Sequence, residues 1–290
     1  MRYPSRSPVV VGVTGTSSGL AAVRHAAREA VSRGCQLRVV HAFTWPSPLP
    51  PTAGLDYDRA RRAASRVIEE AVATAKRSTP RVRVTGQLVD GPADRVLVQL
   101  SRGAQVLVLG DDGLATAPWL PATSVLVQTV ARAWCPVLVA RGPRPPSGPV
   151  MVAVDGSACS VLALRLAAEE GRRRHAPVEL VHVTREPGPR AEPAAREILA
   201  SAVAAVPELA PAETRVLTGM PGPALVRASG QARLIVLGPR GTRDAGLLGS
   251  VAREVLHRAA CPAVFVHGQA IPAQRTGAGT DRAGTALTRP

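Results

Sequence analysis

The chain has few aromatic residues and no long apolar run, and each shortage excludes a class of protein. Aromatic residues make up 2% of the 290 positions, which leaves few platforms on which nucleic-acid bases could stack. The longest apolar runs are far too short to cross a bilayer, so we expect no membrane partner. The opening MRYPSRSP is followed by a short strand-like run without a small-residue cleavage pattern, which predicts no secretory signal and a cytoplasmic protein.

Cysteine is scarce as well. The four cysteines lack the close spacing that zinc sites and redox motifs require. Cys35 and Cys159 are isolated, whereas Cys135 and Cys261 stand at two matching Cys-Pro steps. We therefore expect buried free thiols.

Acidic residues are too few to balance the basic ones. The 36 Lys and Arg residues outnumber the 21 Asp and Glu residues, for a formal net charge of +15, and a basic surface attracts nucleic-acid phosphates. However, the basic residues are almost all arginines scattered among acids. The densest cluster, Arg172 to Arg174, lies at a predicted helix end, where cations complement the helix dipole. We interpret it as a solvated face and expect no nucleic-acid partner; a steep salt dependence of binding would contradict this.

The chain does contain an internal duplication. VVVGVTGTSSGLAAVRHAA returns as PVMVAVDGSACSVLALRLAA, in a register that runs without a gap from Val11/Val152 to His41/His182. Further on, AQVLVLGDDG matches ARLIVLGPRG, and WCPVLVA matches ACPAVFV. A period of this length corresponds to a whole domain.

The duplication defines the domain organisation. We assign unit one to residues 8–141 and unit two to residues 149–267, joined by the stiff linker RGPRPPSG. Residues 268–290 lack periodicity and are predicted to be a disordered tail.

Each unit alternates short β-branched runs with longer Ala-rich stretches. Continuous apolar runs such as VLVLG and LIVLG are typical of strands that a parallel sheet buries on both faces. Such alternation predicts the α/β class, with a Rossmann-like, doubly wound sheet in each unit. The clearest predicted helices span 17–33 and 58–77. The predicted strands lie near 8–14, 36–43, 81–88, 105–110 and 136–140 in unit one, and near 149–155, 177–184, 214–218, 233–238 and 262–267 in unit two.

Candidate ligand-binding residues follow the first and fourth strands of unit two, since ligands of such sheets bind beyond the carboxyl ends of the strands. Asp155-Gly156-Ser157 supplies a carboxylate, a turn and a helix-capping serine. Gly238-Pro239-Arg240-Gly241 follows the fourth strand, and Gly249-Ser250-Val251 opens the last helix. Glycines allow a phosphate close to the backbone, and free amides at a helix start attract an anion. Ordinary turns and caps are the alternative; the full set favours a nucleotide or phosphate site.

These motifs resemble the universal stress protein family, over both units. The resemblance implies a five-stranded parallel sheet of the adenine nucleotide alpha hydrolase-like type in each domain. It also implies binding of an adenine nucleotide, either ATP, with or without Mg²⁺, or a shorter one, without an established reaction. The last strands, PVLVA and PAVFV, would pair within the chain as an internal pseudo-dimer, and homodimerisation of whole chains stays open.

The resemblance also implies roles for individual residues of unit two. Asp155 and Val183 would meet the adenine or ribose in a pocket that Ala153 lines. Gly238 and Gly241 would lie along the ribose and phosphates, and Arg240 would assist. The phosphates would be held by Gly249, Ser250 and Val251.

Both units depart from the family pattern. In unit two the segment after Gly241, TRDAGLL, is two residues shorter than the family spacing, a difference of at most roughly 7 Å of chain that favours a shorter nucleotide. In unit one Thr14 replaces the aspartate, Thr123-Ser124 replaces Gly-Ser, and Asp111 and Asp112 place carboxylates where a polyphosphate would lie. We expect a weak or inactive site there. For the two aspartates we favour an acidic solvated loop over a metal-binding pair.

Catalytic constellations are missing from the pattern. We find no Ser/His/Asp or Cys/His set, and His41 and His182 stand at matching strand ends, which indicates a shared structural role. The sequence thus predicts a nucleotide-binding regulatory protein of the stress response rather than an enzyme, with slow ATP hydrolysis left open. The alternative is an interaction scaffold that binds no nucleotide.

Overall fold

The computed structural model describes residues 7–45, 54–111, 114, 119–142, 144, 146–185, 188, 191–239 and 248–266. The predicted tail, 268–290, lies outside them. In unit one the strands are β1 (Val9–Gly12), β2 (Leu37–Phe43), β3 (Val84–Asp90), β4 (Val106–Leu109) and β5 (Val137–Val139), and the helices are α1 (Ser17–Ser32), α2 (Gly54–Ser78), α3 (Ala93–Leu100) and α4 (Val125–Arg132). In unit two the strands are β6 (Val150–Ala153), β7 (Val178–Thr184), β8 (Glu213–Thr218), β9 (Leu234–Leu237) and β10 (Ala263–Phe265), and the helices are α5 (Ala158–Arg174), α6 (Ala191–Ala205), α7 (Pro221–Ser229) and α8 (Ser250–Arg258).

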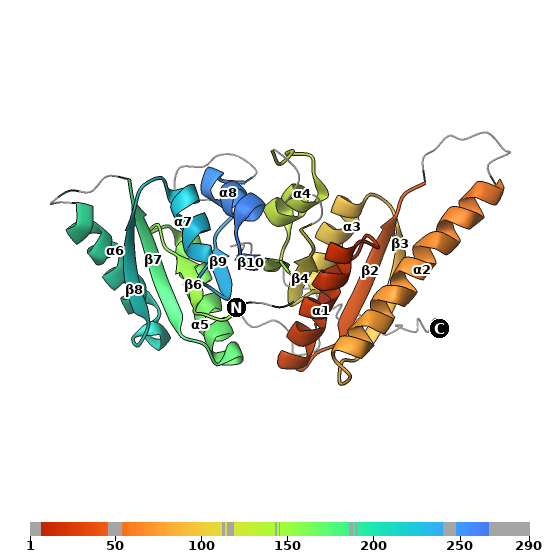
Figure 1. Cartoon of the computed structure of the whole chain (residues 1–290), viewed down its shortest axis with the longest axis horizontal. Coiled ribbons are helices and arrows are strands. Elements are labelled where there is room, and N and C mark those ends of the chain that lie inside the picture. The colour runs from red at the N-terminus through yellow and green to blue at the C-terminus, as the bar shows by residue number, and fades with distance from the viewer. Residues whose placement is uncertain are drawn as a thin grey trace, which may run out of the picture.

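The ten strands form one sheet in the order β3-β2-β1-β4-β5-β10-β9-β6-β7-β8. Within each unit all neighbours are parallel, as the sequence predicts. Between the units, β5 and β10 pair antiparallel, with Leu138 opposite Val264. These two strands occupy the middle of the molecule, and the units extend to either side (Figure 1).

Strand ends differ from the predicted ones mainly at the outer edge of unit one. β3 begins at Val84 and ends at Asp90, whereas the prediction was 81–88. The reason is its pairing with β2, which matches Leu37 with Val84 and continues residue by residue to Phe43 opposite Asp90. The neighbouring strand therefore sets the length of β3, which its own composition does not reveal.

Helices cover both faces of the sheet. One apolar core lies between the sheet and the helices α1, α2, α5 and α6, and the other lies between the sheet and α3, α4, α7 and α8. β4 and β9 are buried along their whole length, which explains their uninterrupted apolar sequences.

Both units enter their first helix through the same turn. Gly15 and Gly156 have φ values of +80° and +77°, a region that glycine adopts without steric cost. Thr16 then caps α1 by accepting from the Gly19 amide at 3.0 Å, and Ser157 caps α5 by accepting from the Ser160 amide at 3.2 Å.

The units also meet through a buried cluster of charges, which we call the ion cluster. It joins Glu29 of α1 and Arg33, the C-cap of α1, with Glu170 and Arg174 of α5. The register that aligns Val11 with Val152 also aligns the two glutamates and the two arginines. Arg33 Nη2 lies 2.5 Å from Glu170 Oε1, and Arg174 pairs with both Glu29 and Glu170.

The ion cluster corrects one interpretation made from the sequence. Arg173 and Arg174 do not form a solvated face, because their side chains are only 14% and 17% exposed and pair with acids. Burial opposes the charged form of Glu29, but Arg174 and Arg33 outweigh it and lower the pKa of that carboxyl. The contact between α1 and α5 therefore repeats itself across the pseudo-twofold axis, as an isologous interface does.

Candidate functional site

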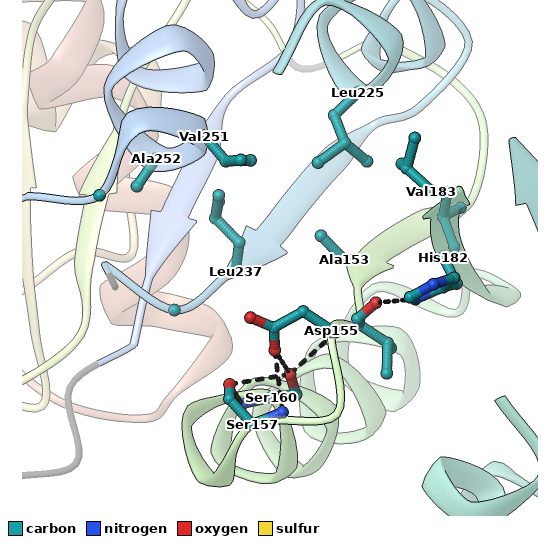
Figure 2. Close-up of a pocket in the computed structure, with 14 residues that line it drawn as sticks. Ala153, Asp155, Ser157, Ser160, His182, Val183, Leu225, Leu237, Val251 and Ala252 are labelled. Carbon is teal, nitrogen blue, oxygen red and sulfur yellow. Dashed lines mark hydrogen bonds between the residues drawn. The ribbon is translucent and has the colours of Figure 1, made fainter. Parts of the chain in front are cut away.

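A cavity of about 110 Å³ opens beyond the carboxyl ends of the unit-two strands, at the point where the winding reverses between β6 and β9. Figure 2 shows its apolar walls, with Val183 and Leu225 on one side and Leu237 and Val251 on another. Six residues predicted from the sequence line it together: Ala153, Asp155, Val183, Gly238, Gly249 and Val251.

Asp155 is the charged group of this cavity. Its Oδ1 accepts from the Ser157 amide at 3.0 Å and from the Ser160 hydroxyl, and its own amide donates to Ser160 Oγ at 3.1 Å. Burial would raise the pKa of the carboxyl, but the hydrogen bonds from Ser157 and Ser160 outweigh that effect and lower it. Asp155 is therefore an anion at neutral pH, oriented through one oxygen.

His182 lines the same cavity, and its ring faces a backbone carbonyl rather than the Asp155 carboxylate (Figure 2). Its Nδ1 is 2.7 Å from the carbonyl oxygen of Val154, and in unit one Nδ1 of His41 is 2.7 Å from the carbonyl oxygen of Val13. A carbonyl can only accept, so Nδ1 carries the hydrogen in both rings. Each histidine thus links the second strand of its unit to the residue that follows the first strand, which confirms the predicted structural role.

The opposite wall is the start of α8. Gly249 is its N-cap and offers no side-chain hydrogen bond to the first turn, so the cavity meets a helix start whose cap bears no side chain. Ser250 opens the helix, but its side chain is exposed and is not part of the lining. Two further predicted residues, Arg240 and Gly241, lie outside the described residues, as does most of the shortened TRDAGLL segment.

Several lining residues were not predicted from the sequence, among them Ser160, Leu225 and Ala252. Ser160 stands one helical turn after Ser157, and its hydroxyl beside a strand-tip carboxylate was a detectable signal. Leu225 and Ala252 reach the cavity from α7 and α8, and no local pattern distinguishes them from other apolar residues of amphipathic helices.

Unit one has a cavity at the equivalent place, with a volume of about 230 Å³. Thr14 occupies the position of Asp155, and Gly19 that of Ser160, so the carboxylate and its hydroxyl partner are both missing there. Ser124 caps α4 by accepting from the Val127 amide at 3.2 Å. The first turn of α4 is thus capped where that of α8 is not.

Asp111 differs from its expected orientation. Its Oδ1 accepts from Ser18 Oγ at 2.5 Å, its amide donates back to Ser18 Oγ at 3.0 Å, and its Oδ2 lies 3.6 Å from Arg141 Nη1. Asp111 does not line the cavity, because these partners hold it to one side. Asp112 lies outside the described residues.

Three cysteines are buried free thiols as predicted: Cys35, Cys135 and Cys261. Among the described residues, no three His, Cys, Asp or Glu side chains gather as a metal ion would require. No helix in the same part of the chain has the length and apolar content needed to cross a membrane.

Two parallel α/β units, each with a cavity at its topological switch point, define a tandem Rossmann-like protein. The family model described as "Universal stress protein family" matches residues 6–141 and 147–267. The chain therefore belongs to the universal stress protein family and carries two domains of that family in tandem.

Known relatives agree in length and fold. Two universal stress proteins of Mycobacterium tuberculosis are each 33% identical to this chain, over 286 and 285 residues, and each alignment covers 88% of this chain and 95% of the relative. The crystal structure of a universal stress protein from Archaeoglobus fulgidus superposes with a TM-score of 0.66 at 16% identity, covering 91% of this chain and 97% of that one. The likeness to that structure concerns the fold alone.

Proposed function

We propose that unit two binds an adenine nucleotide and that the protein acts as a nucleotide-responsive regulator rather than as an enzyme. The observation that carries this proposal is the convergence, around one cavity, of an ionised Asp155, apolar walls and the uncapped helix start at Gly249. Each element suits a different part of a nucleotide.

The apolar walls suit the base. Val183 and Leu225 provide a surface against which a flat heterocycle can pack, as in most small-molecule sites. Asp155 suits the ribose, because Oδ1 is already engaged by Ser157 and Ser160 and Oδ2 can accept from a sugar hydroxyl. A charge-assisted hydrogen bond of this kind is about twice as strong as a neutral one.

The start of α8 suits the phosphates. Helix N-termini bind anions through free amides and the helix dipole, and Gly238 and Gly249 leave room for a close approach. ATP, with Mg²⁺ to neutralise the charge near Asp155, and a shorter adenine nucleotide both fit this chemistry. The two missing residues after Gly241 favour the shorter one.

The test is calorimetric titration of the full chain with ATP and Mg²⁺, ADP and AMP, with mass analysis of any nucleotide that co-purifies. We expect one equivalent to bind. Gly249→Val with Ser250→Ala should abolish binding, because the valine side chain would obstruct the approach to the first turn of α8. The matched control is Thr123→Val with Ser124→Ala at the same positions of unit one, which should leave the affinity unchanged.

The second candidate function is an interaction scaffold without a nucleotide. The continuous sheet through β5 and β10 and the ion cluster favour it, since both support a rigid internal pseudo-dimer. Absence of binding, together with absence of co-purified nucleotide, would support the scaffold. Equal affinity in the Gly249/Ser250 variant would instead overturn the assignment of the site.

A further inference from the structure

We propose that the cavity of unit one binds a neutral apolar ring compound about the size of a bicyclic aromatic such as indole. This cavity has about twice the volume of the one in unit two, about 230 Å³ against about 110 Å³. Five leucines line it, from β4, α3, α4 and the segment before α4: Leu97, Leu109, Leu114, Leu120 and Leu126.

The described lining contains no Asp, Glu, Lys or Arg. Thr14 takes the place of Asp155 and pairs with Thr16, their hydroxyl oxygens 3.0 Å apart. His41 is engaged with the Val13 carbonyl, and Ser124 with the Val127 amide. A charged ligand would lose its hydration with no opposite charge in the lining to compensate, which is unfavourable. A neutral ligand avoids that cost.

Anions are disfavoured for a second reason. Asp111 stands at the same end of the sheet and forms a charge pair with Arg141, so this guanidinium already has an acidic partner. The Ser124 hydroxyl accepts from the Val127 amide in the first turn of α4, so this amide is not free to bind a phosphate. The features that suit unit two to a nucleotide are therefore replaced or occupied in unit one.

Two exposed apolar side chains belong to the lining or adjoin it in sequence. Val125 lines the cavity and is 41% exposed, and Trp119, next to the lining residue Leu120, is 66% exposed. An exposed apolar lining residue such as Val125 offers an apolar ligand additional contact surface.

The volume sets the size of the ligand. A dry engineered cavity of about 150 Å³ lined by aliphatic and aromatic side chains binds benzene. A cavity about one and a half times as large holds a fused pair of rings. We therefore choose indole as the probe, and indole-3-acetate as the same ring with a negative charge.

The test is calorimetric titration of the full chain with both compounds. We expect indole to bind with one equivalent and indole-3-acetate to bind at least tenfold more weakly. Ala42→Phe, which fills the cavity from β2, should abolish indole binding. The matched variant Val183→Phe, at the same position of unit two, should leave indole binding unchanged while it blocks the nucleotide site.

A gentler variant guards against misfolding. Thr14→Asp installs the carboxylate that unit two already carries at this position and should weaken indole binding at least tenfold. Three results would overturn the proposal. One is that indole fails to bind wild type up to its solubility limit, and another is that the Ala42→Phe and Thr14→Asp variants bind indole as tightly as wild type does. The third is that indole-3-acetate binds wild type as tightly as indole does. None of these results depends on whether unit two binds a nucleotide.

Discussion

Glu170→Gln is the substitution that most directly tests how the two units are held together. The Glu170 side chain is 2% exposed and pairs with Arg33 and Arg174. The four members of the ion cluster carry two negative and two positive charges, so the neutral glutamine leaves an uncompensated positive charge in a buried place. Removing one partner of a buried ion pair costs about 3–5 kcal/mol, and we expect the free energy of unfolding to fall by that amount.

Urea unfolding of the full chain, followed by circular dichroism, measures this loss. The matched control is Glu169→Gln, because the Glu169 side chain is 50% exposed. Water solvates this carboxylate, so its loss should stay below about 1 kcal/mol. Glu29→Gln should cost as much as Glu170→Gln, since the two glutamates are equivalent by the repeat. The double variant Glu170→Gln/Arg174→Gln restores the charge balance, so its loss should be smaller than the sum of the single losses by about 1–3 kcal/mol.

Two results would refute this reasoning. One is a Glu170→Gln variant no less stable than the Glu169 control, and the other is strict additivity in the double variant. The pH dependence offers a further check through Glu29. Because the pKa of Glu29 is lowered in the fold, its contribution is complete above the ordinary pKa of a glutamate and is lost as the pH falls through the folded value.

Three other predictions concern single groups. Burial and Arg28 lower the pKa of His25 from 6.5 to about 4, so the unfolded chain binds more protons than the folded chain between these pH values. Wild type should therefore lose stability between pH 7.5 and pH 5, and His25→Leu should remove about 2 kcal/mol of that loss in urea unfolding. An unchanged pH dependence of the unfolding free energy in this variant would contradict the prediction. In the same assay, Asp155→Ala should lower the free energy of unfolding by about 1 kcal/mol near neutral pH, because its hydrogen bonds are lost. The pKa of Asp155 is lowered in the fold, so this difference from wild type should shrink only as acid protonates the carboxylate. Burial raises the pKa of Cys135 and of Cys261 to about 12, so iodoacetamide at pH 8 should label neither thiol before unfolding, as peptide mass analysis would show; stoichiometric labelling of the native chain would argue against their burial.

The strands and the parallel order within each unit could be predicted because they depend on local composition. An uninterrupted apolar run such as LIVL in β9 is compatible with few environments other than the middle of a parallel sheet. The capping role of Ser157 is equally local, since a serine three residues before its amide partner is enough to recognise it.

The ion cluster could not be predicted in the same way. Arg174 follows a run of arginines at a helix end, and its partner Glu29 lies in the other unit, far away in sequence. Local charge patterns describe the helix but not what packs against it. Only the internal alignment, which places Glu29 with Glu170 and Arg33 with Arg174, contained a signal, and that signal requires knowing that α1 and α5 meet.

The two units differ most where a ligand would lie. Contacts to the backbone recur in both units: His41 and His182 each contact a strand-end carbonyl, and Ser101 and Ser229 each accept from an amide before the last strand, both at 2.9 Å. Equivalent positions at the two cavities differ: Thr14 corresponds to Asp155, Gly19 to Ser160 and Leu126 to Ala252. The residues that hold the sheet together are thus shared, whereas those that determine polarity and volume are not. This pattern is expected if one scaffold presents two chemically different pockets, and it is why each pocket needs its own ligand and its own control.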